Sequence, residues 1–480
     1  MGGMQPGKDL EKVPNPRKGS VSSETNTVDV QVQRRLLRKL DRHVYPILFV
    51  IHMMSFLDRV NISNARIQGL TADLELEGNR FNIALFVPSN MIIRHVRPCW
   101  YLPGLMFSWG IINMSMGFVH TYGGLAVLRF FLGAAEAGVF PGIIYLTSMY
   151  YKRHEFQIRM SFLFCSTQVA GAFGGLLAYA IAHLDGSLGY RAWRWIFIIE
   201  GAATAVVAVI AVFLVVDWPE DCRFLTKAEK DLLKHRLASD GTDCARMDTL
   251  NKQACKRIFS DAKIWLASFI YMGVGVPGYS TTFFMPTILL EFGYKAEQAQ
   301  ARTIPVYVVS AAGMLITGFL SDRYKHRYSF IVAGCFIATI GFGILLNQGT
   351  LSRDAKFAAI FLVSLGGHIG NPMALAWLSN NVSGHWKRAF SSAFQVTLGN
   401  IAGIIAANIF LSDESPAYPT GYGTAFAMLW VAGLSATAMF GFMLVENRRR
   451  DAGKRDYRLS QPEEEIKNIG DNHPSFRFTL

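Results

Sequence analysis

Two short stretches place charged residues inside apolar segments: Phe56-Leu57-Asp58-Arg59-Val60-Asn61 and Leu128-Arg129-Phe130-Phe131-Leu132-Gly133-Ala134-Ala135-Glu136. Both belong to apolar runs long enough to cross a membrane, where an ionisable side chain costs roughly 3 kcal/mol on insertion scales. Such residues usually face a water-filled cavity or one another. These charges therefore predict a polar cavity among membrane-spanning helices. The alternative is a structural ion pair that holds two helices together.

Helix geometry supports a shared cavity. Arg129 and Glu136 are seven residues apart, which at about 100° per residue returns them to nearly the same helix face, about 10 Å apart along the axis. Counted from the predicted span ends, Asp58, Arg59 and Arg129 lie at one depth and Glu136 lies nearer the middle. Two cations beside two carboxylates suit an organic anion that travels with protons, because protonating a carboxylate frees its guanidinium partner.

Composition favours an integral membrane protein. Hydrophobic residues make up 51% and charged residues 17% of the 480 residues, and the mean hydropathy is +0.25. The net charge of +12 is spread over tails and short loops, as in cytoplasmic loops, so we expect no nucleic-acid partner. The cysteines lack a Cys-x-x-Cys spacing, and no nucleophile-base pair is evident. We therefore expect no metal site, no cofactor other than coupling protons, and no enzymatic activity.

Twelve apolar runs are predicted to span the membrane. They are Val44–Ala65, Ile83–Ile93, Tyr101–Val119, Tyr122–Tyr151, Met160–His183, Trp193–Val216, Ile264–Leu290, Thr303–Leu320, Ser329–Leu346, Phe357–Leu378, Phe390–Leu411 and Thr424–Val445. Six plus six predicts an all-α membrane protein of two six-helix bundles, with the substrate between them. The predicted parts are a cytoplasmic tail (1–43), a first bundle (44–216), a central cytoplasmic loop (217–263), a second bundle (264–445) and a cytoplasmic tail (446–480).

The loop after the eighth predicted span carries a short motif, Gly318-Phe319-Leu320-Ser321-Asp322-Arg323, followed by further basic residues. Glycine lets helices approach closely, and an aspartate can accept from a helix N-terminus or an arginine. In this place the motif resembles the loop signature Gly-x-x-x-Asp-Arg of the major facilitator superfamily. The resemblance implies the major facilitator fold, with Gly318, Asp322 and Arg323 as a gating motif.

A closer resemblance extends from Leu40 to the tail. Three runs, Phe56 to Arg66, Arg129 to Gly142, and Trp193-Arg194-Trp195-Ile196-Phe197, are similar to the fungal anion:cation symporters of the allantoate permease type. The ending His473-Pro474-Ser475-Phe476-Arg477-Phe478 most resembles that of nicotinic acid permeases. The resemblance implies proton-coupled uptake of a small organic carboxylate: nicotinate, or a related vitamin or allantoate-type anion. We expect a multi-pass monomer in the lipid bilayer of the plasma membrane, with both termini cytoplasmic.

The resemblance also implies roles for the charged residues. In related organic-anion symporters the matching aspartate and fourth-span glutamate carry protons, here Asp58 and Glu136. The neighbouring arginine, Arg59, meets the substrate carboxylate, and Arg129 couples the two functions and contributes to substrate binding.

Two polar residues occupy positions where relatives hydrogen-bond the substrate: Gln168 in the fifth span and Asn400 in the eleventh. A hydrogen bond between helices is the alternative for both. Tyr271 and Tyr279 in the seventh span could form an aromatic wall over a flat heterocycle, although ordinary packing explains them too. The pair Lys387-Arg388 is predicted to be a basic anchor on the inner side.

Two other functions remain open. Drug:proton antiporters of the same superfamily carry a proline-containing glycine motif in the fifth span, whereas this chain has Gly171-Ala172-Phe173-Gly174-Gly175. A non-transporting nutrient sensor usually has long cytoplasmic extensions, and these tails are short. A shortened, inactive gene product is the third alternative.

The second span motivates the first prediction. Its 11 apolar residues, Ile83–Ile93, make roughly 16 Å of helix against a hydrocarbon core of about 30 Å. Relatives have a stretch about ten residues longer here, and bilayer thinning does not readily absorb such a mismatch. We expect the 480-residue chain to fold poorly or not to transport, whereas a longer transcript with the extra residues is active. Uptake measured for both forms in one host tests this, and strong uptake by the 480-residue chain refutes it.

Overall fold

The computed structural model describes residues 23–65, 68, 70, 73, 98–136, 138–151, 153–238, 258–383, 385–460 and 469–480. The predicted second span lies outside these residues, so its shortening remains a prediction. The chain divides into two units, Met1–Arg42 and His43–Leu480, and every site residue discussed below lies in the second. Across the described residues the secondary structure is helical, without strands.

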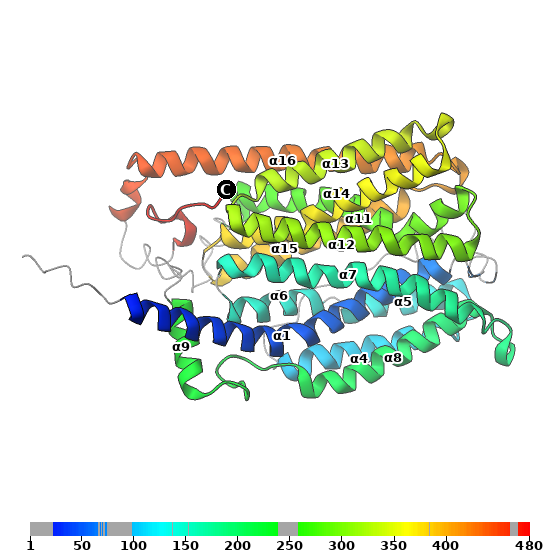
Figure 1. The fold of residues 1–480 in the computed structure, drawn as a ribbon, viewed down its shortest axis with the longest axis horizontal. Coiled ribbons are helices and arrows are strands. Elements are labelled where there is room, and N and C mark those ends of the chain that lie inside the picture. Colours follow the sequence, from blue (N-terminus) through cyan, green and yellow to red (C-terminus); the bar gives the residue numbers. More distant parts are fainter. Residues whose placement is uncertain are drawn as a thin grey trace, which may run out of the picture. The chain divides into compact units, whose positions relative to one another are not determined.

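Helices occupy every predicted span other than the second (Figure 1). They are α1 (Ser23–Ala65), α4 (Pro98–Met116), α5 (Tyr122–Glu136), α6 (Val139–Tyr150), α7 (Arg153–Ala182), α8 (Ala192–Leu214), α11 (Ala262–Glu291), α12 (Ala296–Tyr324), α13 (Tyr328–Leu346), α14 (Arg353–Asn380), α15 (His385–Asn408) and α16 (Pro419–Asp451). A further helix, α9 (Lys227–Ala238), lies in the predicted central loop.

The fourth span was predicted as one segment, and the structure describes it as two helices, α5 and α6. Gly138 is the N-cap residue of α6. Glycine is a poor helix former, and a Cβ at Gly138 would lie only 2.2 Å from the Tyr101 hydroxyl. Gly138 has helical backbone angles and allows the close contact with α4, and the residue between α5 and Gly138 lies outside the described residues.

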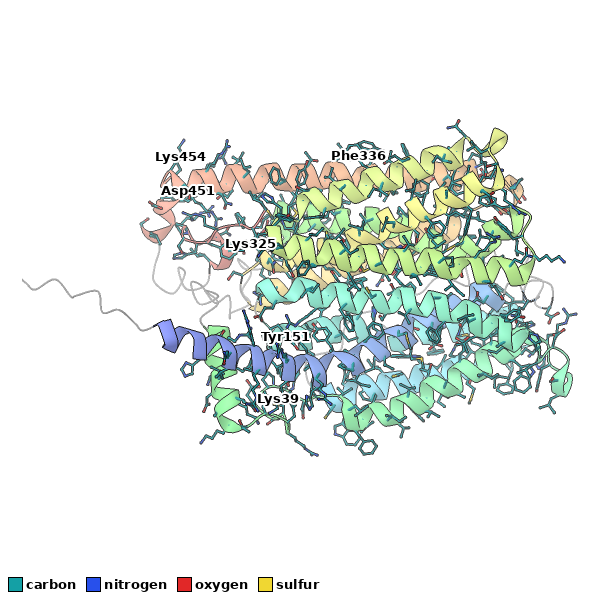
Figure 2. The ribbon with its side chains drawn as sticks, viewed as in Figure 1. Lys39, Tyr151, Lys325, Phe336, Asp451 and Lys454 are labelled. Atoms are coloured by element: carbon teal, nitrogen blue, oxygen red, sulfur yellow. The ribbon has the colours of Figure 1, made fainter. Side chains whose placement is uncertain are left out.

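Within the described residues, seven helices are long and apolar enough to cross a membrane: α7, α8, α12, α13, α14, α15 and α16. Large apolar side chains are exposed along several of them, including Phe213 on α8 and Phe319 on α12. Phe336 of α13 is also exposed, at the outer side of the helices (Figure 2). Exposed apolar side chains on long helices are expected where lipid, rather than water, surrounds the protein.

Glycine contacts bring α4 and α8 together, and these helices lie side by side in Figure 1. A Cβ at Gly201 of α8 would be 2.3 Å from the backbone nitrogen of Met114. A Cβ at Gly110 of α4 would be 2.8 Å from the backbone nitrogen of Ala205. Small residues let the two backbones approach closely, and this approach sets the position of the polar side chains that α4 and α8 share.

Lys387, predicted as a basic anchor, is buried in a charge cluster that ties residues 469–480 to the helices. Its Nζ lies 2.5 Å from Asp261 Oδ2 and 2.8 Å from Asp471 Oδ1, and Lys263 Nζ lies 2.5 Å from Asp471 Oδ2. Burial opposes ionisation, but the two lysines hold the pKa of Asp471 below its ordinary value, and the two aspartates hold the pKa of Lys387 above its own. The carboxyl end of the chain is therefore an ordered part of the protein.

The α4–α8 contact yields a testable prediction. Gly201→Ala places a methyl group against the backbone of α4, and overpacking of this kind costs about 1 to 3 kcal/mol. We expect a lower melting temperature for the detergent-purified protein. Gly441→Ala in α16 is the matched control, since nothing lies within 4 Å of its added Cβ. Equal melting temperatures for the two variants would contradict the close contact.

Candidate functional site

Asp58 is completely buried and accepts hydrogen bonds from three helices. Trp109 Nε1 and Asn113 Nδ2 of α4 donate at 3.0 and 2.7 Å. Thr204 Oγ1 of α8 donates at 3.3 Å, and Asn61 Nδ2 of α1 lies at 3.5 Å. Trp109 and Asn113 are one turn apart, so α4 presents both donors on one face. The Asp58 carboxylate therefore joins α1, α4 and α8.

Arg59 faces away from that network and pairs with α5. Consecutive residues of a helix point about 100° apart, so Arg59 reaches another neighbour than Asp58 does. Its Nε donates to Glu136 Oε2 at 2.6 Å; the side chain of Arg59 is 34% exposed and that of Glu136 only 3%. The second carboxylate oxygen of Glu136 is buried and has no hydrogen-bond partner among the described residues. The pair thus joins a reachable cation to a buried carboxylate.

Arg129 lies against an aromatic ring of α8. It is buried, and its guanidinium lies over the Phe197 ring of α8, 5.5 Å from the centroid. Within the described residues its Nε and Nη2 have no hydrogen-bond acceptor, although Glu136 and Asp58 lie within electrostatic range. Of the two predicted cations, Arg59 is therefore the one that pairs with Glu136.

The two predicted polar contacts lie on α7 and α15. Gln168 is buried; its Nε2 donates to Thr167 Oγ1 at 3.1 Å, and its Oε1 has no partner in the part of the chain that the structure describes. Asn400 is half-buried. Tyr271 and Tyr279 of α11 lie within electrostatic range of Arg59. Arg59 is thus the predicted site residue around which groups from both halves of the chain gather.

The predicted gating motif connects α12 to α7. Asp322 Oδ2 accepts from the backbone N–H of Ile158 at 3.1 Å, and Asp322 Oδ1 lies 3.9 Å from Arg327 Nη2. A Cβ at Gly318 would be 2.5 Å from Ser161 Oγ, so only glycine fits this contact. Arg323 is exposed, and Arg327, four residues further along the chain, is the arginine that lies beside Asp322.

The sequence reasoning missed Glu200. This residue lies in the middle of α8, is 2% exposed, and neither carboxylate oxygen has a hydrogen-bond partner among the described residues. The signal that identified Asp58 and Glu136, a charge inside an apolar run, was equally present in Ile198-Ile199-Glu200-Gly201. Trp109, Asn113 and Thr204 carry no charge, and a single sequence does not distinguish them from ordinary packing residues.

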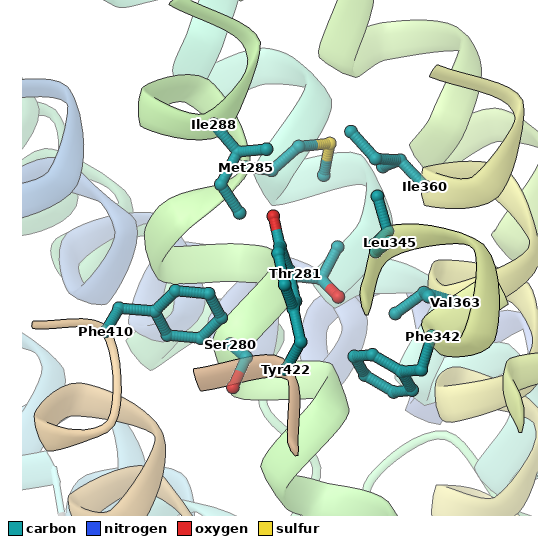
Figure 3. A pocket seen from close by; sticks show the side chains of 10 residues that line it. All are labelled: Ser280, Thr281, Met285, Ile288, Phe342, Leu345, Ile360, Val363, Phe410 and Tyr422. Atoms are coloured by element: carbon teal, nitrogen blue, oxygen red, sulfur yellow. The ribbon is translucent and has the colours of Figure 1, made fainter. Parts of the chain in front are cut away.

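A small pocket lies elsewhere, among the C-terminal helices (Figure 3). Its lining residues are Ser280, Thr281, Met285, Ile288, Phe342, Leu345, Ile360, Val363, Phe410 and Tyr422. The Tyr422 hydroxyl points toward Met285 and Ile288. None of the predicted site residues lines this pocket, and its lining contains no charged side chain that could recognise an anion.

Long apolar helices enclosing buried charges define a multi-pass membrane transporter. The profile described as "Major Facilitator Superfamily" matches residues 81–407, and the chain belongs to this superfamily.

Relatives in fungi and a solved bacterial structure agree with this assignment. An uncharacterized transporter of Schizosaccharomyces pombe is 32% identical over 464 residues, covering 94% of this chain and 91% of that protein. The high-affinity nicotinic acid transporter of Saccharomyces cerevisiae is 26% identical over 461 residues, covering 93% of this chain and 85% of that protein. A bacterial homologue of the human lysosomal transporter Spinster, in an inward-facing and occupied conformation, has a TM-score of 0.56 at 17% identity, covering 82% of this chain and 95% of that one.

Proposed function

We propose that this chain is a secondary active transporter that takes up a small organic carboxylate together with protons, by alternating access. The substrate class is nicotinate or a related vitamin or allantoate-type anion, and the similarity to the nicotinic acid transporter of Saccharomyces cerevisiae supports this choice. The proposal includes a monomer of two six-helix bundles in the plasma membrane, with both termini cytoplasmic.

The Arg59–Glu136 ion pair is the observation that carries the proposal. The Arg59 side chain is one-third exposed whereas that of Glu136 is buried, so an incoming carboxylate can approach the arginine from the exposed side while its present partner remains enclosed. Protonation of Glu136 removes the charge that holds Arg59, and the guanidinium is then free to form a bidentate pair with the substrate. Proton binding and anion binding thus favour each other at one arginine.

The other predicted site residues support substrate binding, proton coupling and gating in this proposal. Among the described residues, Nε and Nη2 of Arg129 have no hydrogen-bond acceptor. These nitrogens suit a second contact to the substrate anion, or a contact to Asp58 or Glu136 when that carboxylate is ionised. Gln168 and Asn400 contribute polar contacts to the substrate, Asp58 takes part in proton coupling, and Gly318, Asp322 and Arg323 form the gating loop. A drug:proton antiporter and a sensor are the rival functions, and inward accumulation of a labelled carboxylate distinguishes the proposed transporter from both.

Glu136→Gln tests proton coupling. Glutamine can still accept from Arg59 but cannot be titrated, so we expect accumulation against a gradient to be lost while exchange of substrate for substrate persists. The measurement is uptake of labelled carboxylates at acid and neutral outside pH in cells without their own permeases, in the 480-residue chain or, if that chain is inactive, in the longer form.

Glu291→Gln is the matched control. Glu291 lies at the end of α11, where Ser415 Oγ donates to it at 2.9 Å, and its loss should leave accumulation intact. Normal accumulation by Glu136→Gln would rule out the proton role of this residue.

Arg59→Lys tests substrate recognition. Lysine keeps the positive charge but cannot present the planar fork that meets both carboxylate oxygens. We expect the affinity for substrate to fall by about tenfold or more, which is about 1.4 kcal/mol or more. Binding is measured by isothermal titration calorimetry of the purified protein. Arg302→Lys is the control, since Arg302 of α12 lies over the Tyr294 ring and is not among the predicted site residues. Unchanged affinity in Arg59→Lys would place the substrate elsewhere.

A further inference from the structure

We propose that Glu200 and Asp58 form a carboxyl dyad that shares one buried proton, and that the proton rests on Glu200 in this conformation. Glu200 is thereby a second proton-binding residue, separate from the Arg59–Glu136 pair. Its place in transport rests on the proposed function, but its protonation does not.

The surroundings of Glu200 disfavour a charge. Both carboxylate oxygens are buried and lack a hydrogen-bond donor within the described part of the chain. A buried carboxylate without donors or a cation is costly, whereas the neutral carboxylic acid gives up far less solvation. A proton on Glu200 removes the charge and adds a donor that can satisfy an acceptor nearby.

The surroundings of Asp58 favour a charge. Each of its oxygens is approached by two donors: Asn113 and Asn61 at Oδ1, and Trp109 and Thr204 at Oδ2. Hydrogen bonds to the ionised form stabilise it. A proton placed on Asp58 would have to displace one of these donors. Of the two carboxyls, Asp58 is therefore the one equipped to be ionised.

Helix geometry brings the two carboxyls to one interface. Asp58 and Asn61 are three residues apart on α1, and Glu200 and Thr204 are four apart on α8, so each pair lies on one helix face. Thr204 reaches Asp58 at 3.3 Å, and the Asn61 amide lies within interaction range of Glu200. Glu200 in turn lies within electrostatic range of Asp58. Two carboxyls that influence each other electrostatically resist being ionised together.

Asn61 offers the acceptor that a protonated Glu200 needs. Asn61 Oδ1 is buried and has no donor among the described residues, while its Nδ2 faces Asp58. A proton on Glu200 can be donated to this oxygen. One added proton thus satisfies two groups that are otherwise unpartnered, and Asn61 connects the acid to the carboxylate.

Few other charges face Glu200. Arg129 of α5 lies over Phe197, one turn before Glu200 on α8, and is thus a cation that packs against the same helix as Glu200. α4 carries no charged residue. The described charged residues of α7 lie in its first two turns, where Glu155 pairs with Arg236 and Arg159 lies over Tyr151. Release of the proton would therefore draw the unpartnered Arg129 nitrogens toward α8.

Infrared spectroscopy of the purified full chain tests where the proton lies. The wild type should show the carbonyl absorption of a protonated, buried carboxyl group at neutral pH. We expect this band to be lost in Glu200→Gln and kept in the matched control Glu291→Gln. Survival of the band in Glu200→Gln, or its absence from the wild type, would overturn the proposal.

The melting temperature gives a second test, which distinguishes a protonated Glu200 from an ionised Glu200 that stabilises the fold. Glutamine resembles the neutral acid, so Glu200→Gln should melt at the wild-type temperature at neutral pH. Asp58→Asn replaces a carboxylate acceptor by an amide among four donors and should melt lower. A large drop for Glu200→Gln would mean that an ionised Glu200 stabilises the fold, which contradicts the dyad.

Transport separates this inference from the proposed function. In a transporting form, Glu200→Gln should move fewer protons per substrate in proteoliposomes containing a pH-sensitive dye. If the wild type moves substrate without protons, the proposed function fails while the infrared result still decides the dyad. If the wild type is proton-coupled and Glu200→Gln has the same proton-to-substrate ratio, the dyad has no place in coupling.

Discussion

The arrangement of α1, α4 and α8 depends on satisfying one carboxylate, Asp58, in an apolar interior. Its donors come from all three helices. A hydrogen bond to a charged group contributes about 1.5 to 3 kcal/mol, and a buried charge left without donors costs more. Rotation or sliding of any of these helices would break some of the hydrogen bonds to Asp58. The glycine contact at Gly201 makes this possible, because it lets α4 and α8 present Asn113 and Thr204 to the same acceptor.

The neighbouring pair has the opposite character. Arg59 and Glu136 share one short hydrogen bond, yet Glu136 keeps an unpartnered oxygen and Arg59 remains partly exposed. Partly satisfied buried groups weaken a fold and are expected where a function needs them. Adjacent residues of α1 thus differ in their surroundings: the carboxylate of Asp58 joins three helices, and the partial exposure of Arg59 suits the exchange of anions that we propose for it.

Span positions were predictable because a bilayer imposes one length on every apolar run, and α8 and α13 coincide with their predictions within two residues at each end. The charges at Asp58, Arg59 and Glu136 were found for the same reason, since each interrupts such a run. Pairing was not predictable. It depends on side-chain reach and helix rotation, so Arg59 rather than Arg129 meets Glu136. The packing of Gly138 against Tyr101 and the burial of Lys387 beside Asp471 join residues that are distant in sequence, so no single run of residues reveals them.

Charge balance connects the proposed dyad to the proposed transport. With Glu200 neutral, the two carboxylates Asp58 and Glu136 face the two cations Arg59 and Arg129, and the buried charges cancel. A substrate carboxylate that enters this interior adds one negative charge. Low-dielectric surroundings penalise an uncompensated charge heavily. In the proposed mechanism one proton therefore enters with the anion. Glu136 receives this proton, because it already lies beside Arg59, the arginine that binds the substrate. An ionised Glu200 would leave an excess negative charge before any substrate arrived and would repel the anion. A neutral Glu200 therefore lets the site accept an anion with a single proton, whereas its release of a proton favours departure of the anion.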